Sequence, residues 1–394
     1  MEVGAVLILG SAGDDTGAAD MSDVLAWTRP AASFSKTPVA MLDVLGEPLL
    51  YRIIEGLHES GVGPIFLLIN NHALAKSAVI RNLGRSWVHV MSAPEDGLGA
   101  ATQATLESCR ERGLRAALVM RASKYLEFDA ADMFRFHSAA SQPITFVSDS
   151  AGRLEIAMID CVASDTAVAF LAKGCEHEPG ARDYALGSYA NRLHTAKDLR
   201  RLAQDALSQR CRIRPNGVEV RPGVWIAESA HLHPHTRVVG PAYVGAHTRL
   251  RAGVLVTRAT SIERNCEVDR GCTIENATIL AGTYLGVGLE IAHAVLDRNR
   301  LIDLRRAIEV DIGDSGLIGP ASLSSAWMGP LVRSVLPAAG RSAWRTLVER
   351  VGNPLSAKPV PAPAPNQFSY GDNKPWPMFE NLPKAADLRT CMKG

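Results

Sequence analysis

The segment from Ser35 to Leu50, SKTPVAMLDVLGEPLL, has the pattern of a phosphate-handling loop followed by a short buried strand and the start of a helix. Arg29 and Lys36 carry positive charges that could contact phosphate oxygens. The position where such a loop would hold a lysine is occupied by Val39. The segment is therefore either a working catalytic loop or the remnant of one.

Carboxylates precede this loop in the stretch GSAGDDTGAADMSDVLAWTRP, at Asp14, Asp15, Asp20 and Asp23. Four negative charges would repel a triphosphate unless a metal ion bridged them. The inserted acidic loop within this stretch, residues 13–27, could form a metal site of its own. Asp149, Asp160 and Asp183 could also supply carboxylates. For all of these residues the simpler interpretation is a solvated loop.

Histidines gather later in the chain, and the stretch AHLHPHTRV places three of them within five residues. The five candidates are His231, His233, His235, His247 and His293. A histidine could serve as the general base of an acyl transfer, and the close spacing could bind a metal ion. Histidines that point outward are more often solvated or in an interface, so both of these functions are secondary hypotheses.

The composition excludes several classes of protein. The chain has 394 residues with a formal net charge of +1, and no Lys/Arg-rich block that would bind nucleic acid. Its seven cysteines are scattered without a Cys-x-x-Cys pair, which favours neither a disulfide scaffold nor a zinc site and is typical of a reducing cytoplasm. No signal peptide and no apolar run long enough to span a bilayer is expected.

Residues 1–205 alternate short apolar runs with helical patterns, which is typical of a doubly wound, mostly parallel α/β sheet. The expected strands are Ala5 to Leu9, Ile65 to Ile69, Trp87 to Met91, Ala116 to Met120 and Ile144 to Val147. The expected helices are Leu49 to Ser60, Ala73 to Leu83, Ala100 to Arg112 and Ala130 to Ser138.

A hexapeptide repeat follows, predicted to form a second domain over residues 212–304. Aliphatic residues occupy every sixth position at Ile226, Leu232, Val238, Val244, Leu250, Val256, Ile262, Val268, Ile274 and Leu280. The series then continues one residue early at Leu285, Ile291 and Val295. Such repeats suit a solenoid with three short strands per coil and resemble those of the left-handed parallel β-helix.

The remaining sequence is less regular. Residues 305–353 are predicted to be a partly helical extension, with a basic, apolar pattern over residues 325–351 interrupted by Pro330, Pro337 and Gly340. That helix could pack on the solenoid, on a partner or on a membrane surface. Residues 354–394 are expected to be a Pro-rich linker and a tail.

The combination of an α/β domain with a hexapeptide solenoid resembles the sugar-1-phosphate nucleotidyltransferases, also called nucleotide-sugar pyrophosphorylases. The stretch PVAMLDVLGEPLLYRIIEGLHESGVGPIFLLIN is similar to the segment that follows the family's signature. The stretch WTRPAASFSKTPVA aligns with the signature itself. EDGLGAATQATLES and ALVMRASKYLEFDAADMFRFH are similar to two later motifs of the family.

The resemblance implies a nucleotide site and roles for particular residues. Nucleotide binding would involve Gly10, Ser11, Gly13, Thr28, Gly97 and Gly99, while Arg29 and Lys36 would assist transfer. An active member would also need Mg²⁺ held by two carboxylates, because negative phosphate oxygens crowd together in the transition state.

Three family positions hold residues that cannot perform this chemistry. Val39 replaces the signature lysine, Ser123 replaces one metal carboxylate, and Arg192, or Asn191 with a one-residue shift, replaces the other. We therefore expect a catalytically degraded relative that binds a nucleotide or nucleotide sugar and regulates or scaffolds sugar supply for envelope or exopolysaccharide synthesis. We expect a homo-oligomer or a complex with an active paralogue. The alternative is an active enzyme with a rebuilt site.

Overall fold

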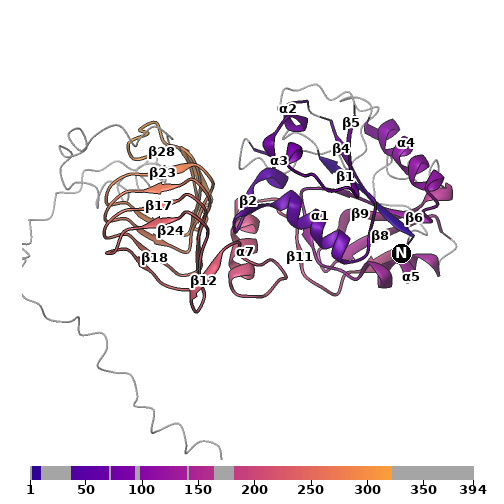
Figure 1. The fold of residues 1–394 in the computed structure, drawn as a ribbon. Helices are drawn as coiled ribbons and strands as arrows, with labels where there is room; N and C mark the ends of the chain where they lie inside the picture. The colour runs from indigo at the N-terminus through magenta and orange to yellow at the C-terminus, as the bar shows by residue number, and fades with distance from the viewer. Residues whose placement is uncertain are drawn as a thin grey trace, which may run out of the picture. The chain divides into compact units, whose positions relative to one another are not determined.

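A computed structural model describes residues 2–9, 37–70, 72–93, 98–139, 142–163 and 182–321 (Figure 1). Its N-terminal part contains a seven-stranded sheet with the order β10-β8-β9-β6-β1-β4-β5. These strands are β1 (Val3–Leu9), β4 (Ile65–Ile69), β5 (Val88–Ser92), β6 (Ala116–Arg121), β8 (Ile144–Asp149), β9 (Gly152–Asp160) and β10 (Arg182–Ala185).

The sheet is mixed, with a parallel centre. β1 pairs in parallel with both β4 and β6, and β4 pairs in parallel with β5. β9 runs antiparallel to β6 and to β8, with which it forms a hairpin. All five predicted strands are confirmed, whereas β9 and β10 were not predicted from the sequence.

Helices bury both faces of the sheet, as a doubly wound arrangement requires. They are α1 (Leu49–Glu59), α2 (His72–Ala75), α3 (Ala78–Arg81), α4 (Leu98–Glu111), α5 (Ala130–Ser138) and α7 (Ala196–Leu207). Leu7 of β1 shares a core with Leu50 of α1, while its neighbour Ile8 shares a separate core with Leu106 of α4. Successive side chains of a strand point to opposite faces, so β1 is buried on both.

The helix predicted over Ala73 to Leu83 is in fact two short helices, α2 and α3. Ser77 separates them and caps α3, because its hydroxyl accepts the backbone N–H of Ile80 at 3.3 Å. A serine that bonds to the backbone favours a helix start over a helix interior.

Residues 37–50, TPVAMLDVLGEPLL, are the described part of the segment that begins at Ser35. They form a short 3₁₀ turn, η2 (Val39–Met41), and a small hairpin of β2 (Asp43–Val44) and β3 (Glu47–Pro48) before α1 begins. The two residues at the tip, Leu45 and Gly46, have φ angles of 54° and 93°. Positive φ at both central positions defines a type I′ turn, which suits a two-residue hairpin. The expected strand and helix start are therefore present.

Residues 218–320 contain the repeat and form three sheets. One has the order β12-β13-β16-β19-β22-β25-β26-β27, the second β14-β17-β20-β23-β28 and the third β15-β18-β21-β24. The strands are β12 (Val218–Arg221), β13 (Val224–Ile226), β14 (His231–Leu232), β15 (Arg237–Val238), β16 (Ala242–Val244), β17 (Arg249–Leu250), β18 (Leu255–Thr257), β19 (Thr260–Ile262), β20 (Glu267–Val268), β21 (Thr273–Glu275), β22 (Thr278–Ile279), β23 (Thr283–Leu285), β24 (Glu290–Ala292), β25 (Ala294–Asp297), β26 (Arg300–Asp303), β27 (Ile308–Asp311) and β28 (Ile318–Pro320). Most neighbouring strands in these sheets are parallel, as stacked coils require.

The coil length changes from 18 residues to 17, and it does so earlier than the sequence predicted. Val244 pairs with Ile262, but Ile262 pairs with Ile279. Ile279 lies in the solenoid core, whereas Leu280 packs into the core of the α/β domain. The prediction that Leu280 continues the inward series was therefore wrong.

The same correction applies to the next coil. Val295 packs with the α/β core, and its neighbour Leu296 takes the place inside the solenoid. Both outward-facing residues, Leu280 and Val295, are apolar because this side of the solenoid is covered by the first domain. A strict six-residue count cannot detect such a covered side.

The chain divides into two units, Met1–Gly352 and Asn353–Gly394, and the second is outside the described residues. The first part of the predicted extension, residues 305–321, contains strands β27 and β28 and no helix. The helix expected over residues 325–351 also lies outside the described residues. Within the described ranges, no helix is both long and apolar enough to cross a membrane.

Candidate functional site

Most residues that the sequence assigned to the nucleotide site are not among those the structure describes. Gly10, Ser11, Gly13, Thr28, Arg29, Lys36 and Gly97 belong to this group, as do the aspartates of residues 13–27. Their predicted roles stay predictions. Gly99 is described and lies in the first turn of α4.

Val39, at the position of the family's lysine, belongs to the apolar core. It is 1% exposed and lies in η2, which packs against α1. Burying the ammonium group of a lysine in these surroundings would be costly. In this conformation, position 39 contributes packing and offers no charge to a ligand.

The carboxyl ends of the parallel strands β1, β4 and β6 lie at one edge of the sheet, the place where open α/β sheets bind their ligands. β6 ends here with Arg121. The next residue, Ala122, donates its backbone N–H to the carbonyl of Ile8 at 2.9 Å, which holds the chain beside β1. Ser123 and Lys124 follow directly at this edge.

A short antiparallel ladder brings the two predicted metal positions together. β7 (Tyr125–Leu126) pairs with β11 (Ala190–Asn191), with Tyr125 opposite Asn191. The ladder therefore places the end of Ser123–Lys124 beside the start of Arg192–His194, although about seventy residues separate them in the chain. Sequence motifs alone identified these positions but not their proximity.

Lys124 is the centre of a buried polar cluster at this edge. Its side chain is 3% exposed, and its Nζ lies 2.6 Å from Glu155 Oε2 of β9 and 3.4 Å from His194 Nε2. Burial lowers the pKa of Lys124, while Glu155 opposes that shift. The pKa of His194 is also lowered, first by burial and then by the charge of Lys124.

Arg192 forms an ion pair with Asp149 at the end of β8. Its Nε donates to Asp149 Oδ2 at 3.1 Å, and its Nη2 contacts Asp149 Oδ1 and donates to the carbonyl of Gly152 at 2.9 Å. The hydrogen bonds from Arg192 hold the pKa of Asp149 below its ordinary value. Both the cation and the carboxylate are therefore already engaged.

Arg121 is a third cation at this edge, beside Lys124 and Arg192. It is 9% exposed, and its Nε has no hydrogen-bond partner among the described residues. Burial lowers its pKa, partly offset by Glu155. A buried guanidinium nitrogen without a partner is a candidate donor to an anionic ligand at this edge.

The donors at the two predicted metal positions do not fit Mg²⁺. This ion prefers carboxylate and water oxygens, whereas the two positions offer a hydroxyl at Ser123 and a guanidinium at Arg192. The nearby carboxylates of Glu155 and Asp149 are bound to Lys124 and Arg192. Across the described ranges no group of three or more His, Cys, Asp or Glu side chains is placed to hold a metal ion.

The alternative assignment, with Asn191 at the second metal position, gives a structural residue. Its Nδ2 donates to the carbonyl of Asp198 at 2.9 Å, and its Oδ1 accepts the backbone N–H of Leu193 at 3.0 Å. Asn191 thus supports the start of α7. Either register leaves this position without a free carboxylate.

Among the other carboxylates and histidines considered from the sequence, Asp160, Asp183 and His233 have structural partners. Asp160 accepts the backbone N–H of Val162 at 3.1 Å, and Asp183 pairs with Arg153 at 2.7 Å. In the solenoid, His233 Nδ1 accepts the backbone N–H of His235 at 3.1 Å. These contacts favour the simpler interpretation over an acyl-transfer or metal site.

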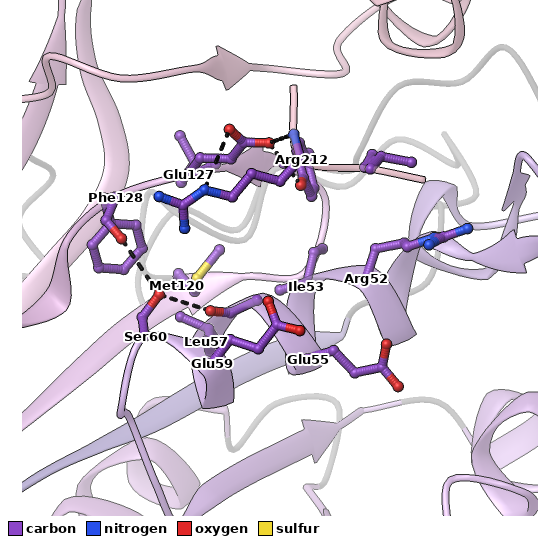
Figure 2. A pocket seen from close by; sticks show the side chains of 14 residues that line it. Arg52, Ile53, Glu55, Leu57, Glu59, Ser60, Met120, Glu127, Phe128 and Arg212 are labelled. Carbon is purple, nitrogen blue, oxygen red and sulfur yellow. Dashed lines mark hydrogen bonds and ion pairs between the residues drawn. The ribbon is translucent and has the colours of Figure 1, made fainter. Parts of the chain in front are cut away.

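A separate cavity of about 100 Å³ lies between α1, β7 and the chain at Arg212 (Figure 2). Glu127 accepts the N–H of Arg212 there, and Ser60 donates to the carbonyl of Phe128 at 3.4 Å. Sites for drug-sized ligands usually occupy about 300–1,000 Å³. This cavity is too small for a nucleotide, so we place the candidate site at the carboxyl edge instead.

Sequence reasoning identified Ser123 and Arg192 but missed Lys124, Glu155, His194 and Arg121. Lys124 adjoins Ser123 in the chain, yet its significance depends on Glu155, which is 31 residues away. The available sequence signal was a lysine within the stretch ALVMRASKYLEFDAADMFRFH, which resembles a family motif.

No protein-family model matches this chain, and the curated proteins contain no match to it. Among solved structures, the chain is similar to HddC from Yersinia pseudotuberculosis, in a crystal structure complexed with GMP-PN. The TM-score is 0.36 and the sequence identity 16%, with 50% of this chain and 97% of that chain covered. A likeness at this level assigns no function to the present chain.

Proposed function

We propose that this protein is a nucleotidyltransferase-like protein that binds a nucleotide or nucleotide sugar without Mg²⁺-dependent transfer. The observation that carries the proposal is the pair of residues at the two metal positions. Ser123 supplies no charge for a metal ion, and Arg192 places a cation where a carboxylate is needed. Lys124 and Arg192 are paired with Glu155 and Asp149, so the candidate donor to a ligand among the described residues of this edge is Arg121.

The ligand class follows from the charges and from the sequence resemblance. Arg121 offers a buried, unsatisfied donor beside the strand ends, which suits a phosphate oxygen. The ion pairs of Lys124 and Arg192 stabilise the edge in the absence of metal. A nucleoside diphosphate or triphosphate would contact Arg121 directly and approach Lys124 only by competing with Glu155.

The biological role that we propose is regulatory or scaffolding, in the cytoplasmic supply of nucleotide sugars for polysaccharide synthesis. Residues 1–205 would bind the ligand, and the solenoid of residues 212–304, which we take to be a left-handed β-helix, would mediate assembly. Residues 305–353 and the tail 354–394 would extend that assembly surface. Partners would be further copies of this chain or an active paralogue.

Calorimetry on the full chain tests the proposal. ATP, GTP, UDP-glucose and GDP-mannose would be titrated with 5 mM Mg²⁺ or with EDTA, and pyrophosphate release would be followed with glucose-1-phosphate and mannose-1-phosphate. We expect at least one of these ligands to bind with an affinity that Mg²⁺ changes less than about twofold, and no pyrophosphate release. Arg121→Met should weaken that binding about tenfold, because a charged hydrogen bond contributes about 1.5 kcal/mol. Lys197→Met, at an exposed position of α7, is the control.

Two results would contradict the proposal. Mg²⁺-dependent pyrophosphate release that is lost in Arg29→Ala and Lys36→Ala would establish the alternative, an active enzyme with a rebuilt site. The absence of binding by all four nucleotides would exclude a nucleotide-binding regulator of this kind.

A further inference from the structure

A carboxylate of the solenoid reaches into the hairpin that follows the signature segment. Glu263, which follows β19, is fully buried. Its Oε1 accepts the backbone N–H of Leu45 at 3.0 Å, and its Oε2 accepts the N–H of Gly46 at 2.9 Å. One side chain thus binds both residues at the tip of the β2–β3 turn, more than two hundred residues away in the chain.

The turn that Glu263 binds is conformationally demanding. Leu45 has a φ of 54°, a region that residues with a Cβ rarely adopt, and Gly46 has a φ of 93°. The carbonyl of Leu45 accepts the N–H of Asn216 at 2.9 Å and Arg52 Nη2 at 3.3 Å. Two consecutive N–H groups in such a turn form a concave site for an anion, which the Glu263 carboxyl fills.

Neighbouring elements surround Glu263 with ionisable groups. Those that face it are Asp43 of β2, Glu47 of β3, Arg52 of α1, Tyr243 of β16, and Arg264 and Cys266 of its own coil. Asp43 is 4% exposed and pairs with Arg264 Nε at 2.8 Å, while Arg52 pairs with Glu47 at 3.2 Å. The Tyr243 hydroxyl has no hydrogen-bond partner among the described residues.

These surroundings favour the neutral form of the carboxyl group. Burial, and next the charge of Asp43, raise the pKa of Glu263 to about 8, although the two backbone N–H groups and Arg52 oppose the shift. Burial also raises the pKa of Asp43. The two N–H groups favour the ionised carboxyl, because each of its oxygens accepts one of them.

We propose that Glu263 is a positioning residue, through which the solenoid fixes the turn at Leu45 and Gly46. The turn connects η2 on one side to α1 on the other, so its geometry sets the end of the signature segment. Any effect of Glu263 on nucleotide affinity rests on the proposed function. The contact of Glu263 with the turn does not depend on that function.

The first test follows the turn by hydrogen exchange of the full chain at pH 6.5, without any ligand. We expect Glu263→Ala to increase exchange of the backbone at residues 43–48 at least tenfold, because both acceptors are lost. Glu263→Gln retains one carbonyl acceptor but turns its amide NH₂ towards the second N–H group, so its exchange should lie between those of the wild type and Glu263→Ala. Glu275→Ala is the matched control, since this solenoid glutamate pairs with the exposed Arg258.

The second test measures the affinity for the best-binding nucleotide of the calorimetric series at pH 6.5. We expect a five- to tenfold loss of affinity in Glu263→Ala and a smaller loss in Glu263→Gln. The control Glu275→Ala should keep the wild-type affinity.

Unchanged exchange at residues 43–48 in Glu263→Ala would overturn the proposal. If that variant does not fold, exchange at residues 43–48 in Glu263→Gln equal to that of the wild type would overturn it instead. If no nucleotide binds but Glu263→Ala exposes the turn, the proposed function fails while the positioning role stands. If a nucleotide binds and the exchange is unchanged, only the positioning role fails.

Discussion

At the scale of single residues, the cluster around Lys124 sets the chemistry of the carboxyl edge. Its ammonium, 3.4 Å from His194 Nε2, disfavours a second positive charge on the imidazole and so lowers the pKa of His194. In Lys124→Met this repulsion is absent and Glu155 is left to attract a proton. We therefore expect the pKa of His194 to rise, as measured by NMR titration of its ring proton. Lys197→Met should leave that titration unchanged.

Two substitutions at the same edge should create a site for a divalent metal ion. In the double variant Ser123→Asp and Arg192→Asp, two carboxylates replace a hydroxyl and a cation, and Asp149 loses its partner. Because oxygen ligands of negative charge are what Mg²⁺ requires, we expect saturable binding that the wild type lacks at this edge, measured with Mn²⁺ by electron paramagnetic resonance. Lack of binding would indicate that these are not the two metal positions.

At the scale of elements, the geometry of the β2–β3 turn requires a glycine at position 46. A Cβ at Gly46 would lie 2.1 Å from Tyr243 Oη and 2.9 Å from Asn216 Cβ, in addition to the strain of a φ of 93°. We expect Gly46→Ala to reduce the free energy of unfolding by about 2–4 kcal/mol, measured by urea denaturation.

Gly56→Ala is the matched control for that measurement. Gly56 lies within α1, and a Cβ there would have no atom within 4 Å. It should stabilise the protein by about 0.5–1 kcal/mol, because alanine loses less backbone entropy in a helix. An equal effect of the two substitutions would contradict the assigned turn geometry.

The elements also show what the sequence can and cannot predict. The strands of the α/β sheet and the repeat were predictable because each is a local pattern of buried apolar side chains. The position of Ile279 rather than Leu280 inside the solenoid was not predictable. Both residues are apolar, because the outer side of the solenoid is covered at this coil. The cluster of Lys124, Glu155 and His194 was likewise hidden, since the β7–β11 ladder and the pairing of β6 with β9 bring its three distant segments together.

At the scale of the whole molecule, the solenoid and the α/β domain share buried contacts and should unfold together. Besides Glu263 and the ion pair of Arg264 with Asp43, a further polar contact is made by Arg200 of α7, which is 4% exposed. Its Nη2 donates to the carbonyl of Ala259 at 2.6 Å and to Asn276 Oδ1 at 2.7 Å. Burial lowers its pKa to about 10, so the guanidinium remains charged at pH 7.

Removing that contact should uncouple the two parts. In Arg200→Ala the carbonyl of Ala259 and the amide of Asn276 lose their donor, and we expect a loss of about 2–4 kcal/mol. Differential scanning calorimetry should then resolve two transitions where the wild type gives one. Arg201→Ala is the control, because that neighbouring side chain is 69% exposed and its ion pair with Asp205 should contribute less than about 1 kcal/mol. One sharp transition at an unchanged temperature in Arg200→Ala would show that apolar packing alone, such as that of Leu280 and Val295, joins the two parts.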